Sequence, residues 1–153
     1  MEILPPRNIV NRFVSAQQDR PTQKRRAYQA EIYYMDSQFG RLIQQLKKQG
    51  LYDNTIIAVV ADHGQGLGDH NWWYHRILYQ EQIRVPLIMR VPGWPAGKAI
   101  PDLVRTTDIA PTILDVLAIE IPSATDGRSV SALVRGIPMH RALHMQMRST
   151  CST

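Results

Sequence analysis

The stretch that decides the fold is Thr55-Ile56-Ile57-Ala58-Val59-Val60-Ala61-Asp62-His63-Gly64-Gln65-Gly66-Leu67-Gly68-Asp69-His70. A continuous run of apolar, β-branched residues is typical of a strand that is buried on both faces of a sheet. The run ends abruptly in an acid, an imidazole and a series of glycines. In open α/β sheets, groups that handle ligands collect just beyond the carboxyl ends of the strands. The stretch therefore predicts a strand over residues 55–61 and a functional corner at Asp62 and His63.

The segments on either side of this strand predict an α/β fold in which helices flank a partial sheet. Apolar residues recur at spacings of three and four over residues 23–49, which indicates one amphipathic helix. This helix, a turn at residues 51–54 and the buried strand follow one another as in half of an α/β unit, for which we expect a parallel sheet. A second strand is expected over residues 85–91. Pro86 must lie at its beginning or on an edge, because proline cannot donate to a ladder.

The last third of the chain predicts two further helices. Asp108 is expected to be the N-cap of a helix that carries Pro111 in its first turn, where a missing N–H does no harm. Residues 129–135 predict a short helix. The expected organisation is an irregular lead-in over residues 1–23, one folded domain over residues 24–135, and a poorly ordered tail over residues 136–153.

Composition excludes several classes of protein. The chain has 153 residues, 44% of them hydrophobic, which suits one ordinary globular domain. Its net charge of +5 is spread over scattered Lys and Arg, so we expect no nucleic-acid partner. A single cysteine, Cys151, excludes an intramolecular disulfide and a cysteine-rich metal site. No apolar run is long enough to span a membrane, and the first residues lack the pattern of a secretory signal.

Asp62 and His63 are the strongest candidates for chemistry. A carboxylate and an imidazole side by side at a strand end can both bind one metal ion, or can act as a general base and its orienting partner. The alternative is that Asp62 only caps a loop and that His63 is a satisfied polar residue. His75 and Arg76 are cations that could bind an anionic group, with ordinary surface charge as the alternative. No activated nucleophile is present in the sequence.

With these residues identified, the chain resembles the later portion of the catalytic domain of the sulfatase family, in the alkaline phosphatase superfamily. The similarity covers about residues 28–134. Its pieces follow the family's order and are Tyr28-Gln29-Ala30-Glu31-Ile32, Met35-Asp36-Ser37-Gln38-Phe39-Gly40-Arg41-Leu42, Asp53-Asn54-Thr55, Ala61-Asp62-His63-Gly64, Leu67-Gly68-Asp69-His70, Arg84-Val85-Pro86-Leu87-Ile88, Thr107-Asp108-Ile109-Ala110-Pro111-Thr112 and Asp126-Gly127-Arg128-Ser129.

The resemblance implies metal-dependent hydrolysis of sulfate esters, on a carbohydrate or an aryl alcohol. It implies a divalent cation, Ca²⁺ ahead of Zn²⁺ or Mg²⁺, with Asp62 and His63 as two of its four protein ligands. It also places His75 where relatives commonly carry a sulfate-binding lysine. The family's other two ligands, an acidic pair, and its Cys/Ser-x-Pro-x-Arg nucleophile motif are absent from these 153 residues. We therefore expect the chain alone to be inactive. Full-length relatives are often exported, so the cellular location stays open.

Two other functions compete with this reading. The first is a phosphoester hydrolase of the same superfamily, in which Asp-His corners bind zinc. Metal preference separates the two, because oxygen-rich sites favour calcium and imidazole favours zinc. The second is a non-catalytic remnant or module that binds polyanions through its basic surface, for which salt-sensitive binding without metal affinity would be diagnostic.

Overall fold

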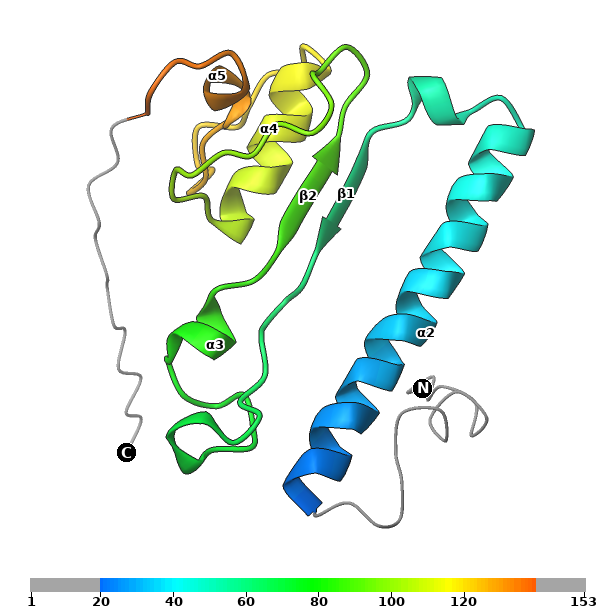
Figure 1. Ribbon diagram of the computed structural model, residues 1–153. Coiled ribbons are helices and arrows are strands. Elements are labelled where there is room, and N and C mark those ends of the chain that lie inside the picture. The colour runs from blue at the N-terminus through cyan, green and yellow to red at the C-terminus, as the bar shows by residue number, and fades with distance from the viewer. Residues whose placement is uncertain (1–19, 140–153) are drawn as a thin grey trace. The chain divides into compact units, whose positions relative to one another are not determined.

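The computed structural model describes residues 20–139, which form two compact units that divide between Pro92 and Gly93 (Figure 1). The first unit contains α2 (Arg20–Lys48), η1 (Tyr52–Asn54), β1 (Ile57–Val60), η2 (Asp69–Asn71), α3 (Gln80–Ile83) and β2 (Leu87–Arg90). The second contains η3 (Thr106–Asp108), α4 (Ile109–Val116) and α5 (Ser131–Val134). This mixture of helices and strands confirms the α/β class. Most of the expected lead-in and tail lies outside the described residues.

Helix α2 begins at Arg20, a few residues before the expected start, with Pro21 in its first turn, where a missing N–H costs nothing. Lys47 and Lys48 lie in its last turn and suit the negative end of the helix dipole. The apolar stripe is present but largely uncovered, since the side chains of Ile32, Met35 and Leu42 are about half exposed. No described residue therefore covers the middle of this face.

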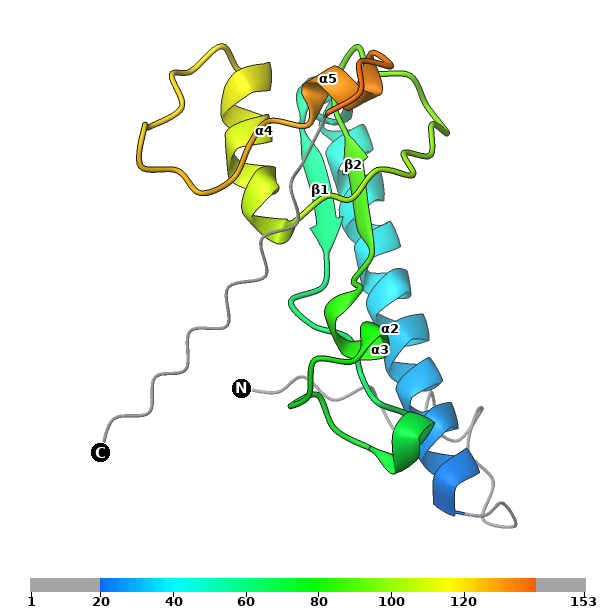
Figure 2. The same cartoon turned by 90° about the vertical axis from the view of Figure 1, so that its left-hand side faces the viewer.

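Strands β1 and β2 lie side by side in both Figure 1 and Figure 2, and they pair antiparallel, with Ile57 opposite Arg90 and Val60 opposite Leu87. Both strands fall within their expected ranges, but the expectations of a parallel sheet and of burial on both faces are wrong for the described chain. Val60 is 41% exposed and Ile88 65% exposed. The reason is that the ladder has two strands only, so described residues cover neither all of its faces nor its outer edges.

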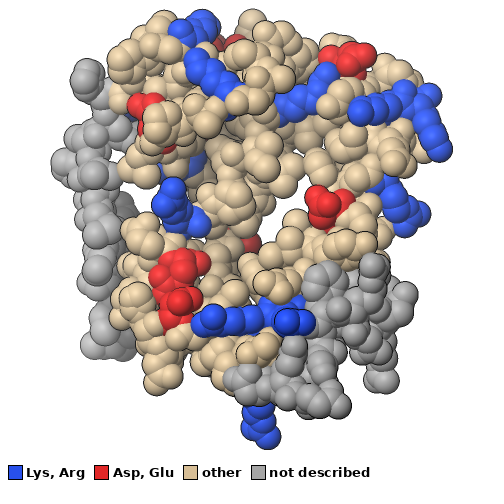
Figure 3. All heavy atoms as spheres, viewed as in Figure 1, with Lys and Arg blue, Asp and Glu red and all other residues tan. Residues whose placement is uncertain are grey.

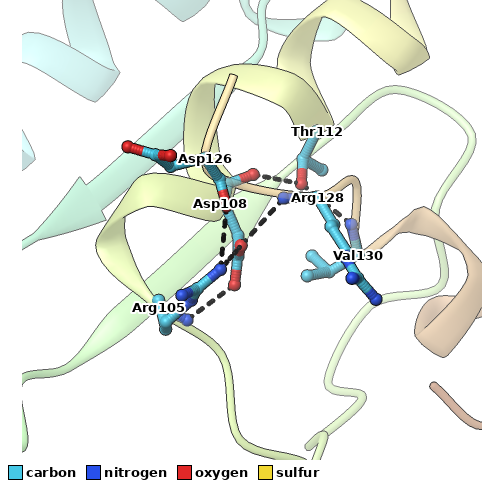
Figure 4. A network of polar contacts seen from close by, with 6 residues as sticks. All are labelled: Arg105, Asp108, Thr112, Asp126, Arg128 and Val130. Carbon is cyan, nitrogen blue, oxygen red and sulfur yellow. Dashed lines mark hydrogen bonds and ion pairs between the residues drawn. The ribbon is translucent and has the colours of Figure 1, made fainter. Parts of the chain in front are cut away.

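In the second unit, Asp108 directly precedes α4, as expected, but its side chain does not cap that helix. The carboxylate is fully buried and accepts hydrogen bonds from two backbone N–H groups, from Arg105 at 2.8 Å and from Arg128 at 2.9 Å (Figure 4). A carboxylate that is buried needs such donors to offset its lost hydration. Asp108 therefore ties the start of α4 to a segment twenty residues further along the chain.

The same junction uses Thr112 and Gly127. The Thr112 hydroxyl donates to the Asp108 carbonyl at 2.6 Å and accepts from the N–H of Val130 at 3.0 Å. A Cβ atom on Gly127 would lie 1.9 Å from the carbonyl oxygen of Thr107, so only glycine fits there. The Thr-Asp-Ile-Ala-Pro-Thr and Asp-Gly-Arg-Ser segments thus form one hydrogen-bonded structural unit.

A second acid of α4, Asp115, accepts hydrogen bonds from the hydroxyls of Ser129 and Ser131. These bonds, helped by the charge of Arg135, hold the pKa of the Asp115 carboxyl below its ordinary value of 3.8.

Over residues 20–139, no helix is both long enough and apolar enough to cross a lipid bilayer.

Candidate metal and anion site

The predicted corner lies where β1 ends, and it folds back against the segment that precedes β2. The N–H of Gly64 donates to the carbonyl oxygen of Gln82 at 2.7 Å, and the N–H of Gly66 donates to Tyr74 at 3.1 Å. A Cβ atom on Gly64 would lie 2.1 Å from the carbonyl oxygen of Glu81, so this close approach of two backbones requires glycine. The glycines therefore fix the position of the residues between and before them.

Asp62 and His63 present their side chains together at this corner. One oxygen of Asp62, Oδ1, accepts from the backbone N–H of His63 at 2.9 Å, and the other, Oδ2, lies 3.8 Å from His63 Nε2. The Asp62 side chain is 90% exposed and that of His63 is 43% exposed. The alternative interpretation was that Asp62 only caps a loop and that His63 is a satisfied polar residue. Each side chain does make one local hydrogen bond, as that interpretation requires. Each also keeps one atom, Oδ2 or Nε2, that faces the other.

The His63 ring is held in the tautomer that a metal ligand needs. Its Nδ1 lies 2.8 Å from the carbonyl oxygen of Gly64. A carbonyl can only accept, so Nδ1 is the donor in this contact, and in the neutral ring Nε2 is the nitrogen that carries the lone pair. Histidines that bind metals almost always donate their other N–H to a carbonyl or carboxylate in this way. The ring is thus prepared for coordination through Nε2.

The separation of the two donor atoms also fits a shared cation. Ligand atoms at about 2.0–2.6 Å from one ion lie at most about 5 Å apart, and Asp62 Oδ2 and His63 Nε2 are 3.8 Å apart. Within residues 20–139, no group of three or more His, Cys, Asp or Glu side chains is arranged to bind a metal. Asp62 and His63 are the two residues that the resemblance assigns to a cation, and that they bind one is a proposal.

His75 lies against this pair. Its ring stacks on the ring of His63, with centroids 3.9 Å apart and planes inclined by 19°. Its Nδ1 lies 3.1 Å from Oε1 of Gln65. The structure therefore places His75 beside His63, which itself lies next to Asp62, although His75 comes from the loop that follows the corner.

Another histidine of the corner, His70, makes contacts of a structural kind. His70 lies 3.6 Å from Glu81 and stacks on the ring of Tyr79, with centroids 4.2 Å apart. In the loop after η2, the rings of Trp72 and Tyr74 are in edge contact, with centroids 5.8 Å apart.

Sequence reasoning missed two glutamines and one arginine that build the corner. The side chain of Gln65 connects His75 to the backbone of Trp73. The buried Gln82 accepts from the N–H of Ile77 at 2.8 Å, and Arg25 of α2 donates to the carbonyl of Leu67 at 2.7 Å. The sequence offered one indication of the role of Gln65, which is its position between Gly64 and Gly66. It is the first residue after His63 that carries a polar side chain.

Comparison with known proteins assigns the chain to a family. The Sulfatase family model matches residues 5–119. An arylsulfatase of Clostridium perfringens is 38% identical over 112 residues, and an N-acetylglucosamine-6-O-sulfatase of Bacteroides thetaiotaomicron is 39% identical over 110 residues. Each alignment covers 71% of this chain, but the chain spans only 23% and 20% of those relatives.

Solved structures agree with the sequence comparison. A phosphonate monoester hydrolase from Silicibacter pomeroyi is 33% identical, with a TM-score of 0.75 over 86% of this chain and 28% of its own. The similarity confirms the alkaline phosphatase-like α/β fold that the sequence predicted. Together with the match of the family model over most of the chain, these similarities show that the chain belongs to the sulfatase family of hydrolases.

Proposed function

We propose that this chain provides the Asp62–His63 half of a divalent-cation site for the hydrolysis of sulfate esters. The observation that carries the proposal is the 3.8 Å separation of Asp62 Oδ2 and His63 Nε2, with His63 Nδ1 donating to Gly64. Sulfatases as a family use a divalent cation. When bound, that cation polarises the sulfate group and lowers the charge barrier to attack.

The cation that we propose is Ca²⁺. Calcium takes oxygen ligands in a flexible geometry, and an exposed carboxylate such as Asp62 suits it. Zn²⁺ and Mg²⁺ are the competing ions, since the imidazole of His63 favours zinc. Whichever of these ions is bound, Asp62 and His63 would bind it, and His75 would contact the anionic group of the substrate beside them.

The proposed substrate is the sulfate ester of a carbohydrate or an aryl alcohol. Support comes from the relatives, of which one is described as an arylsulfatase and the other as an N-acetylglucosamine-6-O-sulfatase. The 153 residues contain no Cys/Ser-x-Pro-x-Arg motif, so they provide ligands but no covalent nucleophile. Purified chain should therefore not turn over 4-nitrophenyl sulfate, with or without added Ca²⁺.

A chimera tests the proposal positively. Residues 55–91 would replace the matching segment of the Clostridium perfringens arylsulfatase, of which this chain spans only 23%. If the relative's own residues supply the remaining ligands and the nucleophile, the chimera should hydrolyse 4-nitrophenyl sulfate in a metal-dependent way, and Asp62→Asn and His63→Ala should abolish turnover. The matched control is His70→Ala, which changes a histidine that contacts Glu81 and Tyr79. A folded chimera that is inactive, or that is indifferent to both ligand changes, would refute the proposal.

A second candidate function has one specific observation in its favour. The phosphonate monoester hydrolase of Silicibacter pomeroyi has a TM-score of 0.75 to this chain, so a phosphorus ester is a plausible alternative substrate class. In the same chimera, turnover of phosphonate monoesters with Zn²⁺ in preference to sulfate esters with Ca²⁺ would favour it.

The polyanion-binding reading has less support. On the face drawn in Figure 3, Lys and Arg side chains occur singly or in small groups, with acidic and uncharged side chains around them. Polyanion sites need a contiguous basic surface. Salt-sensitive binding of heparin by the chain without any metal affinity would nevertheless revive this reading.

A further inference from the structure

We propose that Lys24 and Arg25 of α2 form a second anion subsite beside the candidate site, which selects saccharides that carry a further sulfate beyond the ester to be hydrolysed. The inference rests on the proposed function, because it assumes that a sulfate ester binds next to Asp62 and His63. It deepens that function by naming the substrate class, a multiply sulfated saccharide. The feature that carries it is the meeting of two exposed cations at the ring of Trp73.

Arg25 is held against the corner by one edge of its guanidinium group. Its Nε donates to the carbonyl oxygen of Leu67 at 2.7 Å. A guanidinium group carries five N–H donors in a flat fork, so the edge formed by its two terminal nitrogens remains for a ligand. A sulfate group can accept from both of these nitrogens at once. Arg25 is therefore fixed at one edge and open at the other.

Lys24 is held by an aromatic ring of the same corner. Its Nζ lies 5.0 Å from the centroid of the Trp73 ring, which is a cation–π contact. The ring covers one side of the ammonium group, which has three N–H donors, so donors remain for the oxygen atoms of an anion. The two cations come together at Gly68, where an added Cβ would lie 2.8 Å from Cζ2 of Trp73 and 3.3 Å from Nη2 of Arg25.

The charges of this pair favour an anion. Within residues 20–139, the acids that form ion pairs do so with other cations, which are His63, His70, Arg90 and Arg105. Two like charges at one ring repel each other, and a sulfate group that contacts both removes this cost. Both cations keep their charge at all physiological pH values, so this subsite does not depend on the protonation of a histidine.

The loop that carries Trp73 connects the cations to the candidate site. Two backbone hydrogen bonds join residues 66–68 to residues 72–74 as an antiparallel ribbon. Alternate residues of such a ribbon share a face. The rings on either side of Trp73 contact each other on one face, which places Trp73 on the opposite face together with His75. Two residues of extended chain span about 7 Å. The sulfates of one disaccharide can span such a separation.

The experiment is an NMR titration of the full chain with two chondroitin-type disaccharides, one monosulfated and one trisulfated, at one fixed salt concentration. The trisulfated form should bind about threefold to tenfold more tightly, as expected for two exposed ion pairs, and should shift the amide signals of Lys24, Arg25 and Trp73. Lys24→Gln combined with Arg25→Gln should abolish this preference. Lys47→Gln is the matched control, because Lys47 lies on the same helix and its Nζ is 4.8 Å from the centroid of the Tyr52 ring.

The outcomes separate this inference from the proposed function. No binding of the trisulfated form, equal affinity for both disaccharides, or a preference that survives the double substitution would overturn the subsite. The proposed function would survive if a disaccharide still shifts the His63 signal. A preference that falls as much in Lys47→Gln would reveal general charge attraction and would also overturn the subsite. If the preference depends on Lys24 and Arg25 but the His63 signal never moves, the subsite stands and the proposed function fails.

A single substitution guards against an unfolded double variant. Lys24→Gln leaves the hydrogen bond from Arg25 to Leu67 intact and should lose part of the preference. An unchanged preference in this variant would contradict the role of Lys24. Amide fingerprints establish that each variant is folded.

Discussion

Replacing Gly64 by alanine should open the corner that carries Asp62 and His63. The added Cβ would lie 2.1 Å from the carbonyl oxygen of Glu81, 2.9 Å from its carbonyl carbon and 3.1 Å from Cα of Gln82. All three are backbone atoms, which cannot move away by a side-chain rotation. Because carbon and oxygen rarely approach within about 3.3 Å, the two segments must separate by more than about 1 Å.

This separation has two energetic consequences. It breaks the 2.7 Å hydrogen bond from Gly64 N–H to Gln82, which is worth about 0.5–1.5 kcal/mol. It also adds strain of the kind seen in overpacked sites, about 1–3 kcal/mol. The free energy of unfolding should therefore fall by about 2–4 kcal/mol. With a urea slope of about 1–3 kcal/mol/M, the midpoint should fall by about 0.7–4 M.

Urea unfolding followed by circular dichroism measures this change, and Gly40→Ala is the control. No atom lies within 4 Å of a Cβ at Gly40, which is inside α2, so alanine there should stabilise by about 0.5–1 kcal/mol. A Gly64→Ala chain that unfolds at the same urea concentration as the unmodified chain would refute the close approach of the two backbones.

Further predictions concern the second unit and the chemistry. Asp108→Ala leaves the N–H groups of Arg105 and Arg128 without their buried acceptor and should lower stability by about 2–5 kcal/mol, measured by thermal unfolding; an unchanged midpoint would contradict the role of Asp108 as a tie. The pKa of Asp115 is lowered by two serine hydroxyls, so its contribution to stability is present above its unfolded pKa and is lost as pH falls through the lower folded pKa. Asp115→Asn should therefore be less stable than the unmodified chain near pH 7. The difference should begin to shrink as pH falls toward 3.8 and should be lost once pH is below the lowered folded pKa; a difference that persists in stronger acid would be inconsistent with this linkage.

Much of the fold could be predicted from local pattern. The periodicity of α2, the apolar runs of β1 and β2 and the position of Asp108 before α4 all follow from the chemistry of neighbouring residues. The direction of pairing could not be predicted in this way. The antiparallel register depends on how the corner folds back on Gln82, which is a contact between residues far apart in the sequence.

For the candidate site, too, features that depend on neighbouring residues could be predicted, and features that depend on contacts between distant residues could not. Asp62 and His63 could be found because a polar pair directly follows a strand, and His75 because the family's motif reaches it. Gln65 could not be given a role, because its two partners, Trp73 and His75, come from the loop that folds over it. The prediction that the Asp108 side chain caps α4 was wrong for a related reason. Its carboxylate accepts from a backbone N–H twenty residues away instead of from its own helix.

The central claim is that Asp62 and His63 bind one divalent cation together. Titration of the chain with Ca²⁺, followed through the side-chain ¹⁵N signals of His63, tests it most directly. Two ligands alone should give weak binding, on the order of 1 mM, with Nε2 shifting while Nδ1 stays protonated. Asp62→Asn should abolish the shift, and His70→Gln should leave it intact. A His63 signal that is unmoved by Ca²⁺, or that moves equally in Asp62→Asn, would contradict the account.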